Sequence, residues 1–305
     1  MDSKHVERIA NAVLYEGYML YPYRPSAIKN RRRFNFGVVY PQDYGVAHDE
    51  PFSMQTECMA TTDWRMALDV RVRFLHLTAC EGWQEAVERE VNAPAIRMKD
   101  LLASPRQLKF AFPSKLGNET CAQEPINGEI EISAHQLTEQ IFKITARIMN
   151  LTPLADAQHT SRDEALTVSL VSTHTILNAR GGAFISLLDP PESLREIAGS
   201  LRNIGTYPVL VGAEGERDAM LSSPIILYDY PQIAPESAGD LFDGTEIDEM
   251  LTLRILTLTD EEKREMRNGD ERSRRILERI ESLPPEQLMK LHGAARPAAG
   301  RGGAR

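Results

Sequence analysis

The stretch MALDVRVRFLHL, residues 66–77, decides how the first part of this chain folds. Apolar and charged side chains alternate along it, and one face carries Leu68, Val70, Val72, Phe74 and His76, while the other carries Asp69, Arg71 and Arg73. Successive side chains of a strand point to opposite faces of its sheet, whereas a helix repeats about every 3.6 residues. The pattern therefore predicts an antiparallel strand that is buried on one face.

Other segments before residue 150 also have strand character. Alternation, or enrichment in β-branched and aromatic residues, predicts strands at residues 34–40, 54–62, 128–133 and 140–150. The last two are close in sequence and predict neighbouring strands of a meander. Residues 83–91 have the spacing of a short amphipathic helix, and residues 92–127 predict irregular structure because they contain several prolines and no clear period.

Helix signals become stronger after residue 151. Ser161 and Glu164 have the spacing of a capping box, which predicts a helix with Leu166, Leu170 and Leu177 on one stripe. Thr259 and Glu262 form a second such pair, which opens a charged helix to about residue 281. Shorter elements are predicted as helices at 192–202, 243–258 and 284–291, and as strands at 207–211 and 223–228.

Strands followed by helices indicate an α+β protein rather than a doubly wound parallel sheet. We expect a sandwich-like, antiparallel, β-rich region over residues 1–150 and a mixed α/β region with C-terminal helices over 151–292. The boundary is open, because both regions can share one core. Residues 293–305 are rich in Gly, Ala and Arg and predict a disordered tail.

Composition narrows the class of protein. The formal net charge is −9, which disfavours nucleic acid and anionic membranes as partners. No run of 18 apolar residues predicts a membrane span, and the first residues do not resemble a secretory signal. The three cysteines, Cys58, Cys80 and Cys121, are too few for a disulfide framework, so we expect a reducing, cytoplasmic location.

Sequence motifs for catalysis or metal binding are absent. The chain has no Gly-x4-Gly-Lys-Ser/Thr loop, no Gly-x-Ser-x-Gly elbow and no Cys-x-x-Cys pair, and the sequence predicts no cofactor. The weak candidates for a metal or catalytic site are His76, Cys80 and His174. Four residues on a strand span about 13 Å, which separates His76 from Cys80. His174 falls on the apolar stripe of its expected helix, where a core role is the simpler interpretation.

The most distinctive segment runs from residue 218 to residue 253, which contains eight acidic residues and no Lys, Arg or His. Within it, the aromatic and proline-rich stretch YDYPQIAPE, residues 228–236, has little conformational freedom to lose on binding. We interpret the segment as a surface for a basic partner, with an ordinary acidic loop or a hard-cation site as alternatives. The candidate interface residues are Tyr228, Asp229, Tyr230, Asp240 and Asp243.

Four segments together resemble an uncharacterised bacterial protein family associated with gene clusters of uptake-type nickel–iron hydrogenases. They are LYEGYMLYPYR (14–24), RFNFGVVYP (33–41), LDVRVRFLHL (68–77) and SPIILYDYPQIAPES (223–237). The resemblance extends from about residue 11 to about residue 282. It implies a bacterial cytoplasmic protein that supports the assembly or function of a hydrogenase, without itself holding the nickel or iron.

Two hypotheses for function follow. The first is a non-catalytic accessory or assembly protein that binds another protein, possibly hydrogenase subunits or maturation factors, with homo-oligomers also possible. The alternative is an enzyme or metal-binding protein whose site is built from dispersed His, Asp and Glu residues. Convergence of His76, His174 and carboxylates in one pocket favours the alternative, whereas scattered positions and an exposed 228–236 segment favour protein binding.

Overall fold

The computed structural model describes residues 3–16, 35–80, 83–116, 121–232, 248–269 and 271–284. The chain divides into two compact units. The first contains Met1–Tyr18 and Arg33–Ala234, and the second contains Met19–Arg32 and Pro235–Arg305. Helices and an antiparallel sheet are both present, so the α+β class is confirmed.

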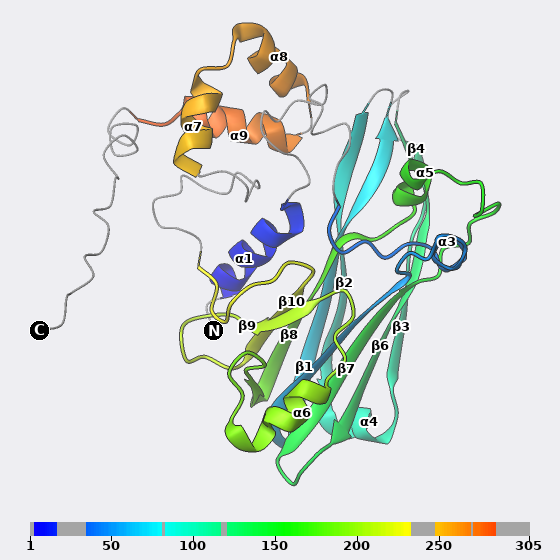
Figure 1. Cartoon of the computed structure of the whole chain (residues 1–305), viewed down its shortest axis with the longest axis vertical. Coiled ribbons are helices and arrows are strands. Elements are labelled where there is room, and N and C mark those ends of the chain that lie inside the picture. The colour runs from blue at the N-terminus through cyan, green and yellow to red at the C-terminus, as the bar shows by residue number, and fades with distance from the viewer. Residues whose placement is uncertain are drawn as a thin grey trace, which may run out of the picture. The chain divides into compact units, whose positions relative to one another are not determined.

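A single ten-stranded sheet forms the body of the first unit (Figure 1). The order of its main path is β3-β6-β7-β1-β8-β10-β9, while β2 and β5 pair with β1 and β4 pairs with β5. The strands are β1 (Ser53–Cys80), β2 (Trp83–Arg97), β3 (Arg106–Phe112), β4 (Lys115–Leu116), β5 (Cys121–Gln123), β6 (Ile126–Gln136), β7 (Ile141–Asn150), β8 (Val171–Ile185), β9 (Tyr207–Leu210) and β10 (Ala219–Ser223).

Strand β1 organises this sheet because it is long enough to have different neighbours along its length. Its first part pairs with β7, and its second part pairs with β2 on that side, while β8 lies on the other side. The predicted alternation at residues 66–77 is confirmed: Leu68, Val70, Val72, Phe74 and His76 are all buried. The apolar members of this face join the main core with Ile130, Ile132 and Ile144 of the predicted meander.

The expected sandwich-like arrangement is not confirmed. The described strands join one nearly closed, barrel-like sheet, because β8 and β10 extend the sheet that β1 and β7 begin. The boundary expected near residue 151 consequently falls inside the first unit, between β7 and β8.

Several local predictions are wrong. The strand expected at 34–40 is, in its described part, only an isolated bridge between Val39 and Leu170. Residues 83–91 belong to strand β2 rather than a helix: Val87 and Val91 are four apart, a spacing that fits both periods, and pairing with β1 selects the strand. The helix opened by Ser161 is only α5 (Arg162–Thr167), and the β-branched run that follows becomes β8. The strand expected at 223–228 ends at Ser223 and continues as a loop.

Irregular structure was predicted for residues 92–127, yet this range contains the whole of β3, β4 and β5 and the helix α4 (Met98–Ala103). The other helices of the first unit are α1 (Ser3–Tyr15), α3 (Gln42–His48), the 3-10 helix η1 (Glu192–Leu194) and α6 (Arg195–Ser200). Val6, Ile9 and Val13 of α1 pack on Ile176 and Leu221, so this helix covers part of the sheet surface around β8 and β10.

The second unit contains α7 (Asp248–Leu256), α8 (Asp260–Asn268) and α9 (Glu271–Glu281). Both predicted capping boxes are confirmed, at Ser161 with Glu164 and at Thr259 with Glu262. The charged helix expected to run from residue 259 to residue 281 is instead two helices, α8 and α9. Across the described ranges, every helix is too short or too polar to cross a bilayer. The expected tail, 293–305, lies outside the described residues.

Candidate functional site

His76 lies on the core-facing side of β1 and is completely buried. Neither ring nitrogen has a geometrically acceptable hydrogen-bond partner, although the backbones of Thr167 and Glu124 are close. Burial, with a smaller contribution from the charge of Arg89, lowers the pKa of His76 to about 4. The imidazole is therefore neutral at physiological pH.

His174 lies on strand β8 rather than on the predicted helix, and it is also fully buried. Its Nδ1 is 3.1 Å from the carbonyl oxygen of Ser172, and burial lowers its pKa to about 3. The sheet register places His174 opposite Arg73, which points away from the core. His76 is three residues further along β1, so the two histidines occupy opposite faces of the sheet.

The weak metal candidates therefore do not assemble into one site. His76 and His174 are separated by the sheet, and the side chain of Cys80 lies outside the described part of the structure. Among the side chains that are described, no group of three or more His, Cys, Asp and Glu residues is arranged to hold a metal ion. Cys58 is buried, and burial raises the pKa of its thiol to about 12, so it is not a reactive thiolate.

The described part of the acidic segment contains a loop, residues 224–230, that follows β10 directly. Asp229 anchors it: one carboxylate oxygen accepts a hydrogen bond of 2.5 Å from the Ser186 hydroxyl, and the other accepts one of 2.8 Å from the Leu210 backbone N–H. The backbone N–H of Tyr230 donates to the Leu210 carbonyl at 2.8 Å, and its side chain packs on the main core. Asp229 and Tyr230 therefore fix the loop.

Immediately before these anchors the loop presents apolar side chains to solvent. Tyr228 is 86% exposed and Ile226 is 74% exposed. The neighbouring loop at Ser186 also carries an exposed Leu188, and Ser186 accepts hydrogen bonds from the backbones of Leu188 and Asp189. We call residues 224–230 the presenting loop. Asp240 and Asp243, the other two candidate interface residues, lie outside the described residues.

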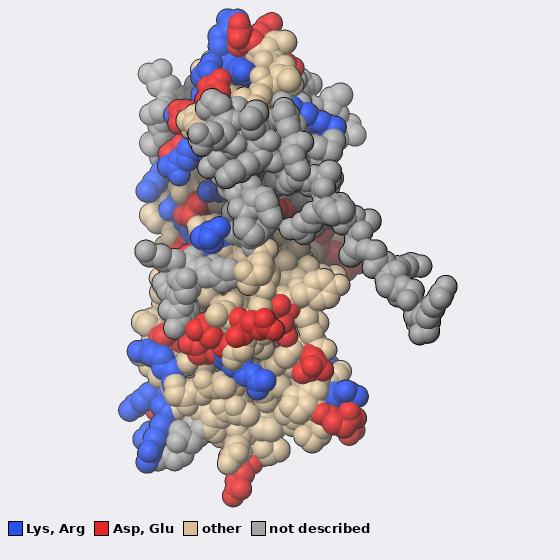
Figure 2. Space-filling model, turned by 90° about the vertical axis from the view of Figure 1, so that its left-hand side faces the viewer, with Lys and Arg blue, Asp and Glu red and all other residues tan. Residues whose placement is uncertain are grey.

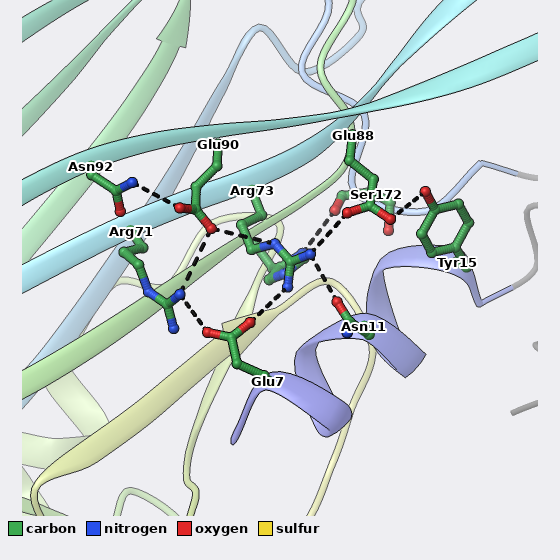
Figure 3. Close-up of polar contacts among 10 residues, drawn as sticks. Glu7, Asn11, Tyr15, Arg71, Arg73, Glu88, Glu90, Asn92 and Ser172 are labelled. Atoms are coloured by element: carbon green, nitrogen blue, oxygen red, sulfur yellow. Dashed lines mark hydrogen bonds and ion pairs between the residues drawn. The ribbon is translucent and has the colours of Figure 1, made fainter. Parts of the chain in front are cut away.

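The densest charged cluster of the first unit joins α1 to the outer face of the sheet (Figure 3). The Arg73 guanidinium donates to Asn11 at 2.8 Å and to Glu88 at 3.2 Å, and it is 3.4 Å from Glu7. Arg71 pairs with Glu7 and is 3.7 Å from Glu90. Tyr15 completes the cluster by donating to Glu88 at 2.6 Å, alongside Asn92 and Ser172.

The charged side chains of this cluster form ion pairs and hydrogen bonds with one another. The Arg73 side chain is only 7% exposed and has three carboxylates around it, so its charge is compensated where it is buried. The partners come from three elements, α1, β1 and β2. We therefore interpret the cluster as the polar contact that holds α1 on the sheet.

The face drawn in Figure 2 carries a patch of carboxylates with basic side chains next to it and uncharged surface around them. Charges of both signs are thus interspersed on the described part of this face. That distribution is unlike the continuous basic surface by which proteins hold nucleic acid.

Sequence analysis did not identify a cavity of about 360 Å³ in the first unit. Polar side chains from distant parts of the chain line it: Asn35, Tyr40, Glu50, Arg162 and Tyr207. One sequence signal near it was the capping box, which placed Arg162 at the first position of α5.

No protein-family model matches this chain, and no curated protein matches it with significant similarity.

Proposed function

We propose that this protein is a non-catalytic accessory or assembly protein that works by binding another protein, with a nickel–iron hydrogenase subunit or maturation factor as its partner. The presenting loop is the proposed binding element. The hydrogenase connection rests on the family resemblance of residues 14–24, 33–41, 68–77 and 223–237.

The observation that carries the protein-binding role is the contrast within the presenting loop. Asp229 and Tyr230 are tied to Ser186 and Leu210, yet Tyr228 between Ile226 and Asp229 is exposed. An isolated exposed apolar side chain is common and needs no explanation. Here, however, a tyrosine and an isoleucine are exposed two residues apart on a backbone that is already ordered. Binding through them loses little conformational entropy.

Tyrosine is also a residue type that often contributes much of the energy of a protein interface. Its ring supplies apolar contact area, and its hydroxyl forms a hydrogen bond at the edge of the contact. A partner surface with an apolar pocket for Tyr228 and basic groups for the adjoining acidic segment fits this arrangement.

Affinity capture from the native bacterium, grown with its hydrogenase expressed, tests the proposal. The tagged wild-type protein should recover hydrogenase subunits or maturation factors above an untagged control, as measured by quantitative mass spectrometry. Tyr228→Ser should lose them. Val46→Ser is the matched control, because Val46 is 70% exposed but lies on α3. Equal recovery by all three proteins, or recovery of no hydrogenase component by the wild type, contradicts the proposal.

A further inference from the structure

The cavity of about 360 Å³ is bounded by five stretches of the chain. They are residues 35–40, residues 50–54, the first residue of α5, Gly205 with Tyr207, and Pro224. All belong to the first unit. The volume lies at the low end of the range for ligand sites, which indicates a small ligand.

One part of the cavity wall is suited to an anion. Arg162 Nε donates to the Tyr40 hydroxyl at 3.1 Å, and the terminal nitrogens of this guanidinium have no hydrogen-bond or ion-pair partner among the described residues. Burial raises the pKa of Tyr40, so its hydroxyl keeps its proton and remains a donor. The hydrogen bond to Tyr40 raises the pKa of Arg162, which stays charged. A guanidinium with a free edge beside a hydroxyl donor matches a carboxylate.

The cavity is also lined by acceptors. The charge of Glu50 contributes to the raised pKa values of Tyr44 and Arg162, behind the larger effects of burial and of the Tyr40 hydrogen bond respectively, but in the described structure Glu50 forms no direct ion pair with Arg162. Asn35 is 91% buried, since its exposed fraction is 9%, and its Oδ1 has no hydrogen-bond partner within the described ranges. A buried acceptor without a partner is uncommon and is normally satisfied by a bound group.

Apolar surface completes the cavity. Val39 and Met54 are buried, and Pro224 and the half-exposed Tyr207 also line it. A ligand with an uncharged body is therefore accommodated between the donors and the acceptors. Because Pro224 is the first residue of the presenting loop, the cavity adjoins that loop in sequence, but ligand binding in the cavity is independent of the proposed protein-binding role.

We infer that this cavity binds a small zwitterion of the α-amino-acid class, with its carboxylate at Arg162 and Tyr40 and its ammonium group at Glu50 and Asn35. A carboxylate alone places a second negative charge near Glu50 and leaves Asn35 Oδ1 without a donor, and an amine alone leaves the terminal nitrogens of Arg162 without a protein or ligand acceptor. Only a ligand that carries both charges satisfies both sets of groups.

Isothermal titration calorimetry of the full chain with each standard L-amino acid tests this inference. At least one amino acid should bind the wild type, and its analogues that lack either the amino group or the carboxylate should bind about tenfold more weakly or worse. Arg162→Gln and Glu50→Gln should each weaken binding of the amino acid by about tenfold or more. Both residues are at least partly exposed, so these variants should fold, which circular dichroism checks.

Arg195→Gln is the matched control: Arg195 is an exposed arginine at the start of α6 and pairs with Glu192 at 2.6 Å, away from the cavity lining. It should bind like the wild type. The inference is overturned if no amino acid binds the wild type, if the deaminated analogue binds equally well, or if Arg162→Gln binds with unchanged affinity.

Discussion

Replacing Arg73 with methionine tests how α1 is held on the sheet. The substitution keeps most of the aliphatic length of the side chain and removes its charge. It leaves Glu7 and Glu90 with Arg71 as their remaining cationic partner and leaves Glu88 with the Tyr15 hydroxyl, and it removes the 2.8 Å hydrogen bond to Asn11.

Breaking a buried ion pair by removing one partner costs roughly 3–5 kcal/mol. The three carboxylate side chains here are 36%, 43% and 38% exposed, so water can hydrate them once Arg73 is gone. We therefore reduce the expected loss in the free energy of unfolding to about 2–3 kcal/mol. Because the contacts reach α1 through Glu7 and Asn11, backbone amides of Ser3–Tyr15 should lose hydrogen-exchange protection more than those of β6 and β7.

Urea denaturation and hydrogen exchange of Arg73→Met measure these two effects. Arg97→Met is the control, because Arg97 pairs with Asp100 on the surface and is 66% exposed, so its loss should change stability by no more than about 0.5 kcal/mol. If Arg73→Met is as stable as Arg97→Met and α1 keeps its protection, the cluster does not hold the helix in place.

Three further predictions concern stability. Burial alone would raise the pKa of Glu57, but hydrogen bonds from the Arg202 backbone and Lys143 lower it overall, so Glu57→Gln should cost about 1–2 kcal/mol near pH 7. Its deficit in urea denaturation should shrink as the pH falls below the unfolded value of about 4.3, because the unfolded chain takes up the proton first and folded Glu57, with its lowered pKa, takes it up at lower pH; a constant deficit contradicts this. Burial lowers the pKa of His174 below its unfolded value of about 6.5, so falling pH protonates the unfolded state first and wild-type stability should drop from about pH 6.5 downward. His174→Gln should reduce that pH slope by about one proton, and an unchanged slope refutes the assignment. Gly37→Ala should destabilise by about 1–2 kcal/mol in thermal denaturation, because φ is +51° and the added Cβ would lie 2.6 Å from Pro224, whereas Gly199→Ala, which meets no atom within 4 Å, should be neutral; equal effects would contradict this account.

The sequence predicted structure correctly where the structure depends on interactions between residues close together in the chain. The alternation from Leu68 to His76 and the two capping boxes depend on residues only a few positions apart, and all three are confirmed. Residues 83–91 and His174 were misassigned because short apolar runs fit both periods, and pairing with β1 decides between them.

The candidate site was harder to predict from the sequence than the fold was. Composition drew attention to Tyr228 and Asp229, but it gave no indication that Asp229 anchors the loop through Ser186, which is 43 residues away. The cavity was not found because Asn35, Glu50, Arg162 and Tyr207 meet only after the sheet has formed. The residues that line such a site do not form a motif with a fixed spacing in the sequence.

The affinity of the purified protein for its captured hydrogenase component is the most direct test of the proposed function. The wild type and Val46→Ser should bind alike in calorimetry or biolayer interferometry. The double variant Ile226→Ser/Tyr228→Ser should bind at least about 30-fold more weakly, as expected when interface residues worth about 2 kcal/mol are removed, with unchanged unfolding stability. Equal affinity of the double variant and the wild type would show that the presenting loop is not the binding surface.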